Sequence, residues 1–235
     1  MIAGMIEAVI FDFDGVIADS EPLHFQAFRD ALASTGRTLA EADYYAKYVG
    51  LSDATLLDAI LADEPSDATS DEIKRLLHDK RARYMAAIRS RPCLMPGAGR
   101  LIEDLYRRWP LAICSGALRT EVTCILDRED LSSRFGVVVT SDDVALSKPD
   151  PQGFLLTLDR LGQTMPSLAA ESCIVVEDSA AGVAAARAAG MRTLGVGRGR
   201  AAERLADAEV VVPSVVDITP DRLGKWFGWT GRTQG

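Results

Sequence analysis

Histidine and cysteine are scarce in this sequence, and both are scattered along it. The 235 residues include two histidines and four cysteines. The cysteines form no CxxC pair, and Cys114 and Cys173 fall inside apolar segments that we expect to be buried. We therefore predict reduced thiols in a protein core, rather than disulfides or a zinc site, and a cytoplasmic location.

Positive charge is also in short supply. The chain has 26 Lys and Arg residues against 34 Asp and Glu residues, which gives a formal net charge of −8 at pH 7. A protein of this charge has no general electrostatic attraction to nucleic acid or to anionic lipid. We therefore expect neither nucleic acid nor a membrane as a partner.

Long hydrophobic runs are missing as well. No apolar stretch approaches the roughly 20 residues that a helix needs to cross a bilayer. The apolar segment 1–11 has no basic leading region, and it runs directly into Asp12 and Asp14, unlike a secretory signal. The sequence predicts a soluble protein in which this segment contains the first strand.

Short apolar segments, many of them β-branched, recur along most of the chain and are typical of strands buried on both faces. The six segments are Ala8–Phe11, Leu111–Cys114, Val137–Val139, Cys173–Val176, Thr193–Val196 and Val210–Val212. Segments with helical spacing lie between them, namely Gly99–Arg108, Leu118–Arg128, Gly153–Leu161 and Ala180–Ala189. This alternation predicts an α/β fold with a Rossmann-like, doubly wound parallel sheet.

One stretch interrupts the alternation. Between Ser20 and about Pro92 no strand-like segment occurs, and apolar residues recur at helical spacing. A chain of 235 residues is long for one minimal domain and short for two full ones. We predict an α-helical domain at residues 20–92, inserted into an α/β core domain at residues 1–19 and 93–235.

Polar residues follow four of the predicted strands. They are Asp12 and Asp14 after the first, Ser115 and Gly116 after the second, Lys148 beyond the third, and Glu177 and Asp178 after the fourth. In an open parallel α/β sheet, ligands bind in the crevice at the carboxyl ends of the strands. We therefore expect these residues to line one crevice.

The chemistry of such a crevice favours a metal ion and a phosphoryl group. So many carboxylates repel one another and do not ionise together unless a cation lies among them. Oxygen donors without an imidazole cluster favour Mg²⁺ over zinc. Lys148, Ser115 and backbone N–H groups would complete a cradle for a phosphoryl group, and an adjacent carboxylate could act as nucleophile and form an aspartyl phosphate.

These residues resemble the haloacid dehalogenase superfamily, and within it the helical-cap subfamily of phosphatases and β-phosphoglucomutases. The resemblance covers essentially the whole chain and rests on four ordered motifs: DFDGV at 12–16, Ser115, SKPDP around Lys148, and EDSAAG at 177–182. It implies a Mg²⁺-dependent phosphatase that acts on a small phosphorylated metabolite, such as a sugar phosphate or a phosphoglycolate-like ester. It leaves the oligomeric state open and is compatible with a monomer.

The resemblance also implies roles for individual residues. Asp12 would be the nucleophile, and Asp14 the general acid that protonates the leaving oxygen and then the base that activates water. Ser115 and Lys148 would bind the transferring phosphoryl group. The true dehalogenases of the superfamily lack an aspartate at the position of Asp14, so carbon–halogen cleavage is disfavoured.

The resemblance implies a metal site and further substrate contacts too. The Mg²⁺ would be held by Asp12, the backbone carbonyl of Asp14 and Asp178, with Glu177 helping directly or through water. The further candidates for substrate or phosphate binding are Gly116, His24, Gly50, Lys80 and Arg119.

Three other functions remain open at this point. A phosphomutase of the β-phosphoglucomutase kind must hold a second phosphate, yet this chain reads Gly50-Leu51-Ser52-Asp53 where that mutase has an arginine after the glycine. Lys80 could compensate for the missing cation. A phosphonate-cleaving relative would need a lysine in the cap loop, and Lys47 only precedes that loop. A binding module without catalysis would have no need of an intact Asp12, Asp14, Lys148 and Asp178.

Overall fold

The computed structural model describes residues 5–49, 51–63 and 69–228. These residues form two compact units: residues up to Asp19 and from Cys93 onward make one, and Ser20–Pro92 make the other. The division coincides with the boundaries expected from the sequence. The two are called the α/β unit and the helical unit below.

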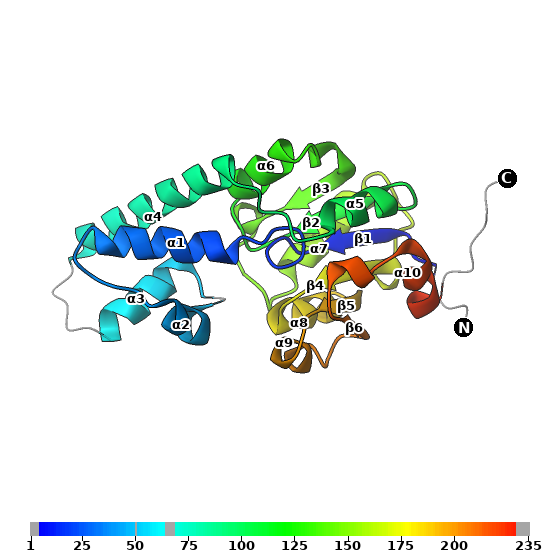
Figure 1. Ribbon diagram of the computed structural model, residues 1–235. Coiled ribbons are helices and arrows are strands. Elements are labelled where there is room, and N and C mark those ends of the chain that lie inside the picture. Colours follow the sequence, from blue (N-terminus) through cyan, green and yellow to red (C-terminus); the bar gives the residue numbers. More distant parts are fainter. Residues whose placement is uncertain (1–4, 50, 64–68, 229–235) are drawn as a thin grey trace. The chain divides into compact units, whose positions relative to one another are not determined.

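A six-stranded parallel sheet with the order β3-β2-β1-β4-β5-β6 forms the centre of the α/β unit (Figure 1). Its strands are β1 (Ala8–Phe11), β2 (Leu111–Cys114), β3 (Phe135–Val139), β4 (Cys173–Glu177), β5 (Arg192–Val196) and β6 (Val210–Val212). Each contains a predicted segment, so the α/β fold is confirmed. The chain moves outward through β1, β2 and β3, and then returns to β4 on the other side of β1. That reversal is the switch point at which doubly wound sheets bind ligands.

Helices cover both faces of the sheet, as buried parallel strands require. They are α5 (Ala98–Tyr106), α6 (Arg119–Arg128), α7 (Gln152–Gly162), α8 (Ala180–Ala188), α9 (Arg200–Arg204) and α10 (Pro220–Phe227). On one face, Ile10 and Val175 pack with Phe154 of α7 and Ala185 of α8. Because parallel crossovers are right-handed and the direction of travel reverses after β3, α5 and α6 lie on the opposite face.

The end of α8 shows how the sequence sets an element boundary. Gly190 follows the helix with a φ of +78°, in the left-handed region that glycine adopts without strain. The N–H of Met191 then donates to the carbonyl of Ala186 at 3.0 Å and closes the helix end. The helical segment predicted from the sequence, Ala180–Ala189, therefore ends at this glycine.

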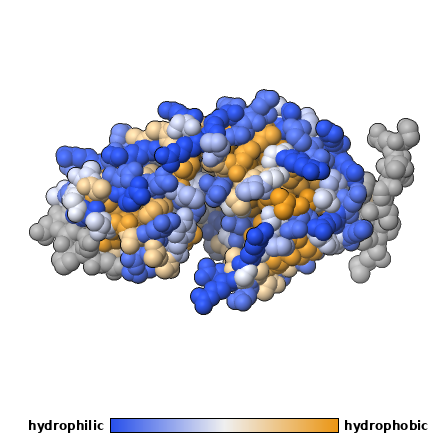
Figure 2. All heavy atoms as spheres, in the orientation of Figure 1, coloured by the Kyte–Doolittle hydropathy of each residue, from blue (hydrophilic) through white to orange (hydrophobic). Residues whose placement is uncertain are grey.

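The helical unit contains no strand among its described residues, in agreement with the sequence pattern. Its elements are α1 (Glu21–Ala33), α2 (Glu41–Asp43), the π-helix η1 (Tyr44–Tyr48), α3 (Asp53–Asp63) and α4 (Ser70–Ser90). Phe28 of α1, Leu57 of α3 and Leu76 of α4 meet in a core of their own. In Figure 2 the visible face is mostly hydrophilic along the helices, with hydrophobic residues between them, as amphipathic helices produce.

Ser20 precedes α1 and is of a residue type that commonly caps helices, but its side chain makes no capping hydrogen bond to α1. Its backbone is in the right-handed helical region, at φ −86° and ψ −24°, whereas a capping serine is usually extended. Its carbonyl accepts from the N–H groups of Leu23 and His24 instead.

Among residues 5–49, 51–63 and 69–228, no helix combines the length and the apolar composition that crossing a membrane requires.

Candidate active site

The carboxylates that follow β1 and β4 meet at the switch point of the sheet. Because β1 and β4 are neighbours, with Phe11 in register with Val176, Asp12 emerges beside Glu177. Oxygen atoms of Asp12, Glu177 and Asp178 all lie within 4.8 Å of one another. The structure therefore brings three predicted site residues from two distant parts of the chain into one cluster.

The turn after Asp12 carries Asp14 and depends on a glycine. Gly15 has a φ of +76°, and a Cβ atom at this position would lie 1.9 Å from Oδ2 of Asp178. The N–H of Gly15 donates to the carbonyl of Ala18 at 2.8 Å and closes the turn. No residue with a side chain can take this place without displacing the Asp178 carboxylate.

Lys148 reaches the cluster from the loop before α7. Its Nζ atom lies 2.5 Å from Oδ1 of Asp12, 2.6 Å from Oε1 of Glu177 and 3.0 Å from the carbonyl oxygen of Cys114. The side chain of Glu177 is fully buried. Such short charge-assisted hydrogen bonds between buried partners fix the lysine firmly among the strand ends. The Lys148–Pro149 peptide bond is cis.

Burial and charge shift the pKa values of this cluster. Burial raises the pKa of Asp12 well above its ordinary value; the Lys148 ammonium opposes that shift, and the neighbouring carboxylates reinforce it. Burial, followed by the charge of Glu177, raises the pKa of Asp178 to about 7. Burial alone would lower the pKa of Lys148, but the Asp12 and Glu177 carboxylates raise it above its ordinary value, so the lysine is charged.

This donor set fits a hard divalent cation. The cluster holds more carboxylates than the single ammonium of Lys148 can neutralise, and these carboxylates add to the rise that burial causes in the pKa of Asp12 and of Asp178. Asp12, Glu177 and Asp178 offer oxygen donors only, which suits Mg²⁺. Glu177 is already held by Lys148 and by Ser179, whose N–H and Oγ donate to its Oε2 at 2.8 and 2.9 Å.

Ser115 follows β2 directly, at the same edge of the sheet. Its N–H donates to the carbonyl of Val139 at 3.0 Å, and its Oγ accepts from the N–H of Ala117 at 2.9 Å. Since the oxygen is the acceptor in that second bond, the hydroxyl keeps its own proton to donate to a ligand. At Gly116 a Cβ atom would meet no atom within 4 Å, so the space around this predicted phosphate-binding position is open.

The cysteines take no part in this chemistry. All four are free thiols, as predicted. Burial raises the pKa of Cys114 to about 11, although Lys148 partly opposes the shift. The thiol nearest the cluster is therefore protonated at neutral pH and is a poor nucleophile.

Two of the predicted substrate contacts, His24 and Lys80, form a cluster in the helical unit. The Nζ atom of Lys80 lies 2.9 Å from Nδ1 of His24 and 2.6 Å from each carboxylate oxygen of Asp53. The Lys80 side chain is only 1% exposed, whereas that of Asp53 is 46% exposed. The third residue predicted for this region, Gly50, lies outside the described residues.

Arg119 begins α6, close in sequence to Ser115. Its guanidinium forms an ion pair with Asp143 and donates to the carbonyl of Val138 at 3.1 Å. The side chain is 43% exposed. The structure thus gives this predicted substrate contact a protein partner of its own.

Sequence reasoning missed several residues that shape the site. Ser179 and Gly182 stand in the EDSAAG run, yet only its two acidic residues were singled out. Ser179 caps α8 by accepting from Gly182 N–H at 3.0 Å, and it also anchors Glu177. A Cβ atom at Gly182 would lie 1.7 Å from Oε1 of Glu177. A serine directly before a helix was the available signal for Ser179, while nothing in the sequence marked Asp143.

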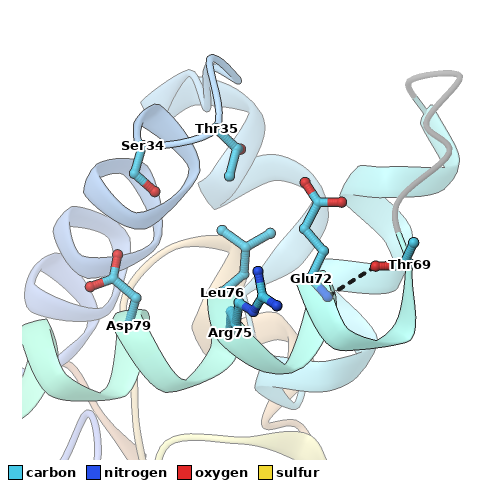
Figure 3. A pocket seen from close by; sticks show the side chains of 7 residues that line it. All are labelled: Ser34, Thr35, Thr69, Glu72, Arg75, Leu76 and Asp79. Atoms are coloured by element: carbon cyan, nitrogen blue, oxygen red, sulfur yellow. Dashed lines mark hydrogen bonds between the residues drawn. The ribbon is translucent and has the colours of Figure 1, made fainter.

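The helical unit also contains a pocket of about 370 Å³ that includes none of the predicted site residues (Figure 3). Figure 3 shows Ser34 and Thr35, at the end of α1, facing Glu72, Leu76 and Asp79 of α4. The pocket is therefore separate from the Lys80 cluster of the same unit.

Comparison with known proteins agrees with this geometry. A family model described as haloacid dehalogenase-like hydrolase matches residues 6–190. The chain is 32% identical over 190 residues to the phosphorylated carbohydrates phosphatase of Thermotoga maritima, covering 80% of this chain and 84% of the relative. It is 30% identical over 222 residues to the β-phosphoglucomutase of Bacillus subtilis, covering 93% and 94%.

A solved structure shares the fold as well. It is CbbY from Rhodobacter sphaeroides in complex with xylulose-(1,5)bisphosphate, which is 25% identical, with a TM-score of 0.78 over 91% of this chain and 96% of that one. The fold, the ordered motifs and the match over most of the chain converge. The protein belongs to the haloacid dehalogenase-like hydrolases, a family of enzymes.

Proposed function

We propose that the protein is a Mg²⁺-dependent phosphatase that hydrolyses a small phosphorylated carbohydrate through an aspartyl-phosphate intermediate. The observation that carries the proposal is the cluster at the switch point, in which the charged Lys148 lies 2.5 Å from Asp12 and 2.6 Å from Glu177, beside Asp178. A nucleophilic carboxylate next to a fixed cation, in a partly buried site, suits transfer of a phosphoryl group.

The proposed reaction has two steps. In the first, an oxygen of Asp12 attacks phosphorus, the bond from phosphorus to the ester oxygen breaks, and Asp14 gives its proton to that leaving oxygen. In the second, Asp14 takes a proton from water, the water oxygen attacks phosphorus, and the bond to Asp12 breaks to release phosphate. Lys148 and the Ser115 hydroxyl bind the phosphoryl oxygens throughout.

A bound Mg²⁺ would supply positive charge for the phosphoryl oxygens and for the crowded carboxylates. The residues proposed to hold it are Asp12, Asp178 and the backbone carbonyl of Asp14, with Glu177 near them. The close approach of the Asp12, Glu177 and Asp178 oxygens supports this assignment, since the mutual repulsion of these carboxylates adds to the rise that burial causes in the pKa of Asp12 and of Asp178.

The names of the relatives support a phosphorylated carbohydrate as the substrate. The Thermotoga maritima relative is a phosphorylated carbohydrates phosphatase, and the structurally similar CbbY was solved with a sugar bisphosphate. A phosphoglycolate-like ester has the same phosphate chemistry and belongs in the same test.

A phosphomutase is the second candidate, favoured by the similarity to a β-phosphoglucomutase. A mutase must bind a second phosphate, which calls for an additional cation. Lys80 is the cation that could replace the missing arginine, but both oxygens of the Asp53 carboxylate already bind it at 2.6 Å. This pairing favours the phosphatase.

The test is phosphate release from a panel of sugar phosphates, phosphoglycolate and nucleotides, with Mg²⁺ or with EDTA. The Asp12→Asn variant serves as the blank, because its amide cannot form the acyl phosphate. Release that requires Mg²⁺ and disappears in the variant is the expected result. Silence across the panel, together with turnover of glucose 1-phosphate in the presence of a bisphosphate primer, would establish the mutase instead.

A further inference from the structure

Asp143 is a carboxylate outside the catalytic cluster that stands at the centre of a hydrogen-bond network. It ends the 3₁₀ turn η3 (Ser141–Asp143), directly after β3, and its side chain is only 14% exposed. Its Oδ1 accepts from Nη2 of Arg160 at 2.9 Å. Its Oδ2 accepts from the backbone N–H and the hydroxyl of Thr140, both at 2.9 Å, and from Nη2 of Arg119. Two arginines and a fully buried threonine thus converge on one carboxylate.

The same turn is tied to the loop between β2 and α6, which carries Ser115. Ser141 donates to the carbonyl of Ala117 twice, from its N–H at 3.1 Å and from its hydroxyl at 3.0 Å. Asp142 accepts from the backbone N–H of Arg119 at 2.7 Å. Ala117 in turn donates its own N–H to Oγ of Ser115 at 2.9 Å. The Ser115 hydroxyl is therefore held by a residue that the η3 turn fixes.

Asp143 also links this loop to the segment that carries Lys148. Lys148 lies in the loop between η3 and α7, and Arg160, the second arginine on Asp143, belongs to α7 itself. Arg119 and Arg160 both donate to the carbonyl of Val138 as well, at 3.1 and 3.3 Å. The Asp143 carboxylate and the Val138 carbonyl thereby connect α6, which follows Ser115, to α7, which follows Lys148.

We propose that Asp143 is a positioning residue for phosphoryl binding, which holds the β2–α6 loop so that Ser115 and Lys148 keep the spacing that a phosphoryl group requires. The inference rests on the proposed function, because it takes Ser115 and Lys148 as the groups that bind the phosphoryl oxygens. The strength of a hydrogen bond falls steeply with distance and angle, so a small shift of the loop weakens binding at a site that Asp143 never touches.

The test compares Asp143→Ala and Asp143→Asn with the wild type. Two quantities are measured with Mg²⁺ present: KM for p-nitrophenyl phosphate and the Kd of inorganic phosphate by calorimetry. In Asp143→Ala we expect both to rise by about 10-fold, because misplaced groups lose much of their effect on the ligand, and kcat to fall by a smaller factor. Asp143→Asn keeps an oxygen acceptor and loses the charge, so its KM and its phosphate Kd should lie between those of the wild type and those of Asp143→Ala.

A matched control separates positioning from general stability. Glu103 of α5 forms an ion pair with Arg134, in which Nε and Oε1 are 2.7 Å apart, elsewhere in the α/β unit. Glu103→Gln should lower Tm and leave KM and the phosphate Kd unchanged. A double-mutant cycle between Asp143→Ala and Arg119→Met adds a second control. If the two residues act through their shared ion pair, the combined effect on KM and on the phosphate Kd should be smaller than the sum of the single effects.

The outcomes distinguish the positioning role of Asp143 from the proposed phosphatase function on which it rests. If Asp143→Ala lowers Tm as Glu103→Gln does and keeps KM and the phosphate Kd within twofold of the wild type, Asp143 is only structural and the inference is overturned. If the wild type binds phosphate without turnover while Asp143→Ala binds it more weakly, the phosphatase is wrong and the positioning role stands. If the wild type binds no phosphate, both are wrong.

Discussion

Each of the two units contains a largely buried lysine that forms an ion pair with a carboxylate. The balance of charge around the two lysines differs. Lys148 of the α/β unit is 17% exposed and contacts Asp12 and Glu177, with Asp178 close by. Lys80 of the helical unit is 1% exposed and forms an ion pair with Asp53. The first lysine is outnumbered by carboxylates, and the second is matched by one.

The neighbours of Lys80 complete the contrast. Its Nζ lies over the rings of Phe28 and Tyr84, at 4.6 and 5.2 Å from their centroids, and against Nδ1 of His24. These groups come from α1 and α4, and Asp53 begins α3, so one ammonium joins three helices.

The comparison teaches that the balance of charge distinguishes the two lysines. An excess of carboxylates, as around Lys148, favours an additional cation, which is what the proposed Mg²⁺-dependent function requires. A balanced pair packed among aromatic rings holds a fold together and leaves little charge for a ligand. Burial alone would not distinguish the two lysines.

The largest expected effect is the loss of activity on removing the charge of Lys148. In Lys148→Met we expect kcat/KM for a phosphate ester to fall roughly 100- to 1,000-fold, because a fixed charge aimed at the reacting group is lost. Steady-state kinetics at saturating Mg²⁺ measure it. Lys225→Met, at an exposed lysine of α10, is the control and should retain full activity. A loss of less than tenfold in Lys148→Met would contradict the role given to this lysine.

The next effect concerns how the carboxylates are placed. Gly182→Ala would put a methyl group 1.7 Å from Oε1 of Glu177 and push that carboxylate away from the cluster. We expect the Mg²⁺ concentration for half-maximal activity to rise at least about 10-fold, as when residues that orient metal ligands are changed. Metal titrations of activity measure it.

Gly162→Ala is the matched control for this substitution. Gly162 also lies in a helix, α7, and a Cβ atom there would meet no atom within 4 Å. This variant should titrate as the wild type does. Equal Mg²⁺ requirements in the two variants would show that the position of Glu177 does not matter for the metal.

The parts of the site that sequence analysis found are those encoded locally. Strand β1 is a run of four buried apolar residues, and Asp12, Asp14 and Gly15 follow it within the next four positions. An apolar strand followed by acidic residues and a glycine can be recognised from the local sequence alone. The doubly wound topology then brings the end of β4 beside this segment. This is why Asp12, Glu177 and Asp178 could be grouped before their distances were known.

The parts that sequence analysis missed depend on tertiary contacts. Asp143 receives Arg119 and Arg160, which lie 24 and 17 residues away in the sequence, and no spacing rule selects these partners. Asp53 pairs with Lys80 across 27 residues. Ser20 shows the same dependence on context, because the identity of the residue fits a helix cap while its backbone conformation does not.

A third prediction tests the balance of charge around Lys80. Asp53→Ala leaves a buried ammonium without a carboxylate, whereas Lys80→Met leaves a carboxylate that is 46% exposed and can be hydrated. We expect Asp53→Ala to lower the free energy of unfolding by about 2–3 kcal/mol, less than the full cost of breaking a buried pair because Asp53 is half-exposed, and Lys80→Met to lower it by about 1 kcal/mol. Urea denaturation of both variants measures the difference.

The double variant Asp53→Ala/Lys80→Met makes this prediction sharper. Once the ammonium is gone, loss of the carboxylate should cost little, so the double variant should be more stable than Asp53→Ala alone. Additive losses would mean that the two groups stabilise the helical unit independently, and the balanced-pair account would be wrong.

The smallest expected effect is a pH dependence of stability that arises from His24. Burial, with a further contribution from the Lys80 ammonium, lowers the pKa of His24 well below its ordinary value of 6.5. The unfolded chain therefore takes up a proton below pH 6.5 that the folded chain does not, so the free energy of unfolding falls as the pH drops. The loss attributable to His24 should be about 1 kcal/mol between pH 7 and pH 5.5.

The measurement compares His24→Asn with the wild type by urea denaturation at both pH values. The groups that face His24 are Lys80 and the ring of Tyr84, which stacks on it with centroids 3.9 Å apart, and an asparagine oxygen can accept from Lys80 in place of Nδ1. We expect the variant to lose about 1 kcal/mol less than the wild type on acidification. If His24→Asn keeps the wild-type dependence, His24 is protonated in the folded chain and does not act as the neutral acceptor for Lys80.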